Sequence, residues 1–103
     1  MWAMETTTLR FAEAARSLGR AARLRGLQVP TFRSPPGIVD AQRTIRRRGQ
    51  SSTVAVALRG RPWGAVVADM VEGIVVANHL DNGRADTVRS ALWLVIEDPA
   101  LAA

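Results

Sequence analysis

Proline and glycine residues divide this 103-residue chain into segments that are each long enough for only one or two elements of secondary structure. The Ser-Pro-Pro-Gly sequence at 34–37, with Pro30 before it, excludes a helix from residues 27–43, because proline fixes φ and has no N–H to donate. Further breaks fall at residues 60–62 and 81–83. The chain is therefore predicted to contain an N-terminal helix, a central β-hairpin and two C-terminal helices.

The first segment, residues 6–24, predicts an amphipathic helix, because its apolar side chains recur at helical spacing on one face. Thr7 or Thr8 is expected to cap the helix, and Gly26 is expected to end it. The apolar residues of this face are Phe11, Ala14, Ala15, Leu18, Ala21 and Ala22. The arginines of the opposite face, which form a secondary basic stripe, are Arg16, Arg20 and Arg23.

Residues 44–48 and 53–59 are predicted to be the strands of a β-hairpin, joined by a four-residue polar turn. Apolar and smaller residues alternate in the second strand, which is typical of a strand with one buried face. In the first strand, Arg46 and Arg48 fall on the face opposite Arg47. The hairpin is therefore expected to carry guanidinium groups on at least one face.

Two C-terminal helices are predicted, over residues 62–78 and 84–97. The first of these segments is also rich in valine and contains two glycines, so a strand–turn–strand alternative is left open. Pro99 is expected to stop the last helix, and residues 98–103 are predicted to fray.

These elements predict a single α+β domain over residues 1–103, in the order α-β-β-α-α, with residues 27–43 as a Pro-rich connecting loop. Phe32 is expected to anchor that loop to the core. The order is similar to the opening elements of a type II KH domain, although the chain has no GXXG loop. The sequence identifies no specific family.

Composition limits the function classes. The chain has no cysteine, which excludes disulfides and thiolate metal sites and fits a cytoplasmic protein. Its longest apolar stretch, residues 63–77, contains Asp69 and Glu72 and is shorter than the roughly 20 residues of a membrane span, so no membrane insertion is expected. We expect no enzyme, metal or cofactor, because His79 and the neighbouring Asp81 match no established motif.

Charge is divided unevenly along the chain. All 14 basic residues are arginine, and 12 of them lie in residues 1–61 with only three carboxylates. Residues 62–103 hold two arginines and six carboxylates. The imbalance favours a polyanionic or acidic partner for the first part of the chain.

The strongest motif is the arginine cluster of the hairpin, which has no carboxylate near it in the sequence between Asp40 and Asp69. Guanidinium groups pair bidentately with phosphate, so the cluster predicts a small regulatory or accessory module that binds DNA or RNA through its backbone. The residues predicted to bind nucleic acid are Arg33, Arg43, Arg46, Arg47, Arg48, Arg59 and Arg61.

A second interpretation is a protein–protein adaptor, whose arginine half contacts an acidic protein while its acidic helices contact another. A homo-oligomeric scaffold, in which two copies pair head to tail, belongs to the same class. The cluster could also be a solvated basic edge strand that prevents aggregation, or its charges could be matched within the molecule by the acidic C-terminal helices. Trp63 is expected to pack in the core, although stacking on a base is an alternative.

Overall fold

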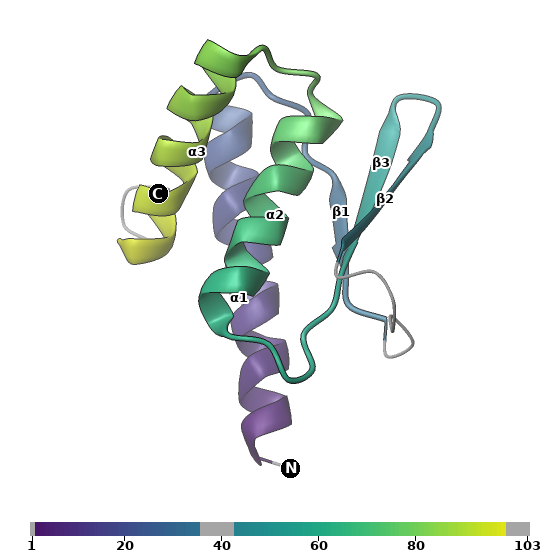
Figure 1. Ribbon diagram of the computed structural model, residues 1–103, viewed down its shortest axis with the longest axis vertical. Helices are drawn as coiled ribbons and strands as arrows, with labels where there is room; N and C mark the ends of the chain where they lie inside the picture. The colour runs from purple at the N-terminus through teal and green to yellow at the C-terminus, as the bar shows by residue number, and fades with distance from the viewer. Residues whose placement is uncertain (1, 36–42, 99–103) are drawn as a thin grey trace.

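The computed structural model describes residues 2–35 and 43–98. The elements in chain order (Figure 1) are α1 (Trp2–Leu24), β1 (Thr31–Arg33), β2 (Arg43–Arg48), β3 (Ser51–Val56), α2 (Trp63–Ala77) and α3 (Asn82–Glu97). A helix comes first, the strands follow and two helices come last, which confirms the predicted α+β class.

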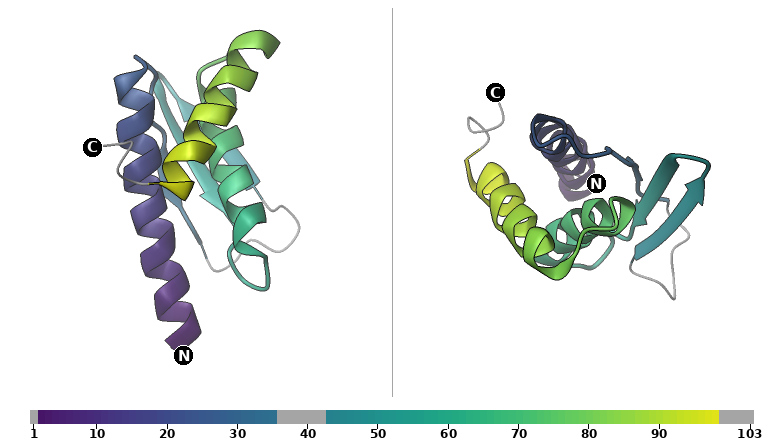
Figure 2. Two further views of the ribbon diagram at one scale, coloured as in Figure 1. Left: turned by 90° about the vertical axis from the view of Figure 1, so that its left-hand side faces the viewer. Right: turned by 90° about the horizontal axis from the view of Figure 1, so that it is seen from above.

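The strands form a sheet in the order β1-β3-β2, in which β1 is parallel and β2 is antiparallel to β3. α2 lies against β2 and β3, while α1 and α3 pack against α2 and against each other. Figure 2 shows all of these helices on one side of the sheet. The other face of the sheet is therefore covered by none of the described helices.

The covered face meets α2 in a close contact between Gly73 and Val54. A Cβ atom on Gly73 would lie 2.7 Å from Cγ1 of Val54, a distance that real Cβ contacts do not show. Only glycine therefore lets the helix approach β3 this closely. The largest fully buried side chains gather around this contact and between the helices, and they include Leu18, Val54, Val56, Met70, Ile74 and Leu92.

The helix ends follow the sequence signals in most cases. Gly26 adopts a φ of +71° after α1, and the N–H of Leu27 donates to the carbonyl of Ala22 at 3.0 Å, as in a Schellman motif. The predicted threonine cap is wrong, because α1 begins at Trp2 and places Thr7 and Thr8 inside the helix. The residues before the predicted start, 2–5, include good helix formers, which extend α1 toward the N-terminus.

The two C-terminal helices are confirmed, and α2 is one helix rather than two strands. An Asp81 Oδ1 atom accepts a 2.9 Å hydrogen bond from the N–H of Arg84 and so caps α3. Asp98 is the C-terminal cap residue of α3. The remainder of the predicted frayed tail, residues 99–103, lies outside the described residues.

The hairpin turn is tighter than predicted, because Gly49 and Gln50 alone connect β2 to β3. Gly49 has a φ of +61°, and glycine at the first position of a two-residue hairpin loop is typical of a type II′ turn. The tight turn moves Ser51 and Ser52 into β3, and this strand ends at Val56 rather than at residue 59.

The predicted connecting loop, residues 27–43, contains a strand that the sequence did not reveal. β1 is only three residues long, and it pairs Phe32 with Val54 of β3. Phe32 packs against the core, as expected. Asn78, at the end of α2, holds the entry to β1, because its side-chain amide accepts from the N–H of Gln28 at 2.7 Å and donates to the carbonyl of Gln28 at 3.0 Å. Residues 36–42 lie outside the described part of the chain.

An ion pair joins α2 to α3. Arg89 donates to both carboxylate oxygens of Glu72, from Nε at 2.5 Å and from Nη2 at 2.9 Å, and it also donates to Asp86 at 2.8 Å. The hydrogen bonds from Arg89 lower the pKa of Glu72, and they outweigh the opposing effect of partial burial.

We expect the Glu72–Arg89 pair to make stability depend on pH. Because the pKa of Glu72 is lowered in the folded protein, the pair stabilises the fold above about pH 4.5, and this contribution is lost as the pH falls below that value. Urea denaturation between about pH 7 and pH 3 should show a smaller loss of stability for Glu72→Gln than for the wild type. Glu13→Gln removes an exposed carboxylate and is the control. Identical pH profiles for the wild type and Glu72→Gln would contradict this account.

We expect Gly73→Ala to lower the free energy of unfolding by about 1–3 kcal/mol, because the added methyl group forces α2 away from Val54. Gly64→Ala is the matched control on the same helix, since its Cβ would meet no atom within 4 Å. The control should leave stability unchanged or raise it by up to about 1 kcal/mol. Chemical denaturation measures both variants. Equal stability of the two would show that the close approach is absent.

Candidate nucleic-acid interface

The register of the hairpin decides which arginines face the helices. Ile45 lies opposite Val54, which is buried under α2, whereas Arg46 lies opposite Thr53. Because successive side chains of a strand point to opposite faces, Arg46 and Arg48 point away from the helices. Arg47 shares the face of Ile45.

The uncovered side of the sheet, here called the open face, is built from arginine, hydroxyl and alanine side chains. Among these side chains there is no carboxylate and no aromatic ring. From the strand register its residues are Thr31, Arg33, Thr44, Arg46, Arg48, Ser51, Thr53 and Ala55.

The arginines of the open face are exposed. Arg33, Arg46 and Arg48 form no ion pair or side-chain hydrogen bond with any described residue. Arg46 and Arg48 are two positions apart, or about 7 Å along a strand, so their repulsion in water is only about 0.6 kcal/mol. The fold therefore tolerates these charges without a ligand, and the guanidinium groups stay available to one.

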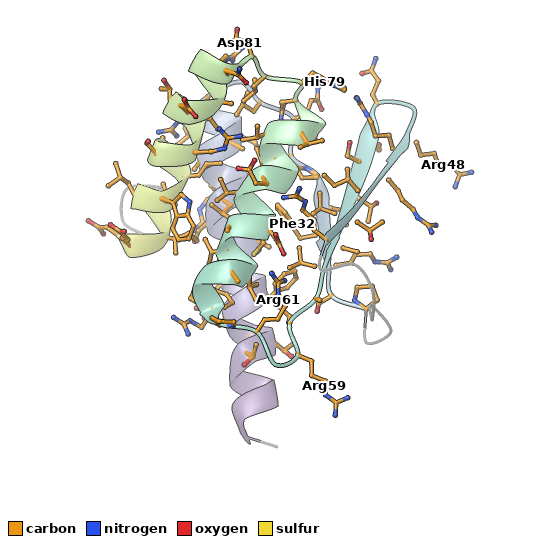
Figure 3. The ribbon with its side chains drawn as sticks, in the orientation of Figure 1. Phe32, Arg48, Arg59, Arg61, His79 and Asp81 are labelled. Carbon is orange, nitrogen blue, oxygen red and sulfur yellow. The ribbon has the colours of Figure 1, made fainter. Side chains whose placement is uncertain are left out.

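The end of the hairpin extends beyond the third strand. β1 pairs only with residues 53–55, so the ladder between Arg47 and Ser52 and between Arg48 and Ser51 has two strands. Residues 46–51 are all exposed. Figure 1 shows this end of β2 and β3 standing apart from α2, and in Figure 3 the side chain of Arg48 points away from the helices. We call residues 46–52 the hairpin tip.

Two of the seven predicted binding residues, Arg43 and Arg61, lie beside a carboxylate of α2 instead. Asp69 of α2 contacts Arg61 Nη2 at 2.7 Å and Arg43 Nη1 at 3.9 Å. Arg61 also donates to the carbonyl of Ala57 at 2.8 Å, and only 11% of its side chain is exposed. For these two residues the charge is matched within the molecule by an acidic helix, because α2 brings Asp69 beneath them.

The contact with Asp69 is chiefly ionic. Its Oδ2 atom is buried and accepts no well-aligned hydrogen bond within the described residues, although it lies 2.7 Å from Arg61. The charge of Arg61 is therefore what compensates this carboxylate. Arg61 serves the fold, by joining the segment after β3 to the start of α2.

Arg59 is exposed, but it does not join the hairpin tip. It follows β3 by three residues, at the end where Val56 pairs with Arg43. Figure 3 shows Arg59 and Arg48 at opposite ends of the sheet, with Arg59 pointing away from the body. Of the predicted cluster, the structure brings together Arg46, Arg47 and Arg48, with Arg33 on the neighbouring part of the open face.

The secondary stripe on α1 is exposed, as predicted, but it is separate from the open face, because α1 packs against α2 and α3 on the covered side of the sheet (Figure 2). A groove of about 600 Å³ between α1 and α3 includes Arg16 and Arg20. Glu13 and Glu97 also line it, so its charge is mixed. The residues of the open face, in contrast, include no carboxylate.

The remaining candidates have structural contacts. Trp63 packs against the core and carries the guanidinium of Arg10 4.4 Å from its ring centroid, so its ring is occupied within the fold. His79 is exposed and has a φ of +52°.

The described residues contain no cluster of side chains that could hold a metal ion. None of the described helices is long and apolar enough to cross a membrane.

No protein-family model matches this chain. Comparisons with curated proteins and with solved structures also give no significant match. The open face and the hairpin tip are therefore the features of the molecule that bear on its function.

We expect Arg61→Ala to lower the free energy of unfolding by about 1–3 kcal/mol, because it leaves the partly buried carboxylate of Asp69 without its main partner. Arg59→Ala removes the same charge two residues away from an exposed position, and should change stability by less than about 0.5 kcal/mol. Thermal or urea denaturation distinguishes the two variants. Equal effects would show that Arg61 is a surface charge, available for binding after all.

Proposed function

We propose that this protein binds nucleic acid through phosphate contacts made by the open face and the hairpin tip. The observation that carries the proposal is the composition of the open face, where three exposed arginines lie among hydroxyl groups without a carboxylate. Arg33, Arg46 and Arg48 supply forked donors that match phosphate oxygens, and the threonine and serine hydroxyls supply further donors.

The same composition favours nucleic acid over an acidic protein partner. Stable protein interfaces usually contain buried apolar or aromatic anchors at their centre. Among the described residues of the open face, only Ala55 has an apolar side chain. A surface of charges and hydroxyls without an anchor suits a ligand whose affinity comes from a row of phosphates.

The proposal predicts little sequence discrimination. Contacts to phosphate fix position and affinity, whereas contacts to base edges read sequence. The proposed interface contains no aromatic ring on which bases could stack, within the residues that the structure describes.

The decisive experiment compares two triple variants with equal loss of charge. We expect Arg33→Ala/Arg46→Ala/Arg48→Ala to bind a fluorescent DNA duplex more weakly than the wild type. The logarithm of the affinity falls linearly with the logarithm of the salt concentration, and each lost phosphate contact makes this slope shallower by about 0.9. The ratio of the affinity at 50 mM salt to the affinity at 200 mM salt should therefore fall by up to about 40-fold. Fluorescence anisotropy at both salt concentrations measures this change. The control is the stripe variant of α1, Arg16→Ala/Arg20→Ala/Arg23→Ala, which should keep most of the wild-type slope.

Circular dichroism melting establishes that both triple variants are folded before their affinities are compared. Equal losses in the two variants would mean that net charge alone attracts the DNA, and would remove the open face as the site. No binding by the wild type at low salt to DNA or RNA would overturn the proposal. In that case, a mass above 11.1 kDa on a sizing column would support the adaptor or homo-oligomer interpretation.

A further inference from the structure

We propose that the nucleic acid is double-stranded DNA in the B form and that the hairpin tip enters its major groove. This inference rests on the proposed function and specifies its ligand. Three features of the tip carry it: its width, the distribution of its arginines over two faces, and the lack of stacking rings.

The width of the hairpin tip matches the major groove. The ladder from Arg47 to Ser52 has two strands, because β1 reaches only as far as Thr53. The major groove of B-form DNA is about 12 Å wide and admits a two-stranded β-ribbon. The tip stands apart from α2 in Figure 1, and residues 46–51 are exposed, so the ribbon is accessible from both faces.

The arginines of the tip point in opposite directions. Arg46 and Arg48 lie on the open face, and Arg47 lies on the other face, opposite Ser52. A single strand presents one row of phosphates, which a ribbon can follow along one face only. A duplex groove has a row of phosphates along each wall, so a ribbon inside it can contact one wall from each of its faces. Only a duplex can therefore place phosphates against the arginines on both faces of β2.

The composition of the tip also argues against the other nucleic acids. Proteins that bind single strands generally stack bases on aromatic side chains, and residues 46–52 contain none. The major groove of A-form RNA is deep and narrow, so a ribbon cannot enter it easily. The lack of rings therefore argues against a single strand, and the narrow A-form groove argues against an RNA duplex, which leaves B-form DNA.

The test measures anisotropy with one sequence prepared as a DNA duplex, an RNA duplex and a DNA single strand, at 50 and 200 mM salt. We expect the wild type to bind the DNA duplex most tightly. On that duplex, Arg47→Ala and Arg48→Ala should each reduce the affinity ratio between the two salt concentrations by about 3.5-fold, which corresponds to one phosphate contact. Arg84→Ala, an exposed arginine on α3, is the single-charge control and should leave the ratio unchanged.

The outcomes separate this inference from the proposed function. Equal or tighter binding of the single strand or the RNA duplex would overturn the duplex DNA inference and leave nucleic-acid binding intact. An effect of Arg48→Ala without an effect of Arg47→Ala would overturn groove entry, as would displacement from the duplex by the minor-groove ligand distamycin. Failure of the wild type to bind any of the three probes would overturn both proposals.

Discussion

The contact between α2 and β3 is the constraint on which the rest of the structure depends. Gly73 lies so close to Val54 that no side chain fits between them, and this contact fixes which face of the sheet the helices cover. A shift of one residue in the register of β3 would exchange its two faces and expose its valines. Once Val54 points inward, the pairing of β2 with β3 directs Arg46 and Arg48 outward.

The same docking of α2 separates two arginines of the cluster from the others. Arg43 and Arg61 come to lie beside Asp69 and stabilise the junction between the sheet and the helix. Arg33 and Arg46–Arg48 remain exposed, and no carboxylate of the described residues pairs with them. The basic charge looks continuous in the sequence, but in the structure part of it stabilises the fold and part is available to a ligand. The proposed function depends only on Arg33 and Arg46–Arg48.

Local signals in the sequence were enough to predict most of the elements. Gly26 after α1 and Asp81 before α3 act at short range, and the structure places both as caps. β1 could not be predicted, because three residues between prolines show no periodicity and are held by pairing with β3. The roles of Asp69 and Arg61 depend on the packing of α2 against the sheet, so the sequence left open which arginines the acidic helices would match. The alternation in β2 did predict correctly that Arg46 and Arg48 face away from Arg47.

The most direct test of the central claim maps the bound surface in solution. Backbone amide chemical shifts of the ¹⁵N-labelled protein would be followed during titration with a short DNA duplex. We expect the largest changes at residues 46–52 of the hairpin and at Arg33, with little change along the Arg16, Arg20 and Arg23 stripe of α1. Changes confined to α1 and α3, with the hairpin unaffected, would contradict the account and move the binding surface to the other side of the molecule.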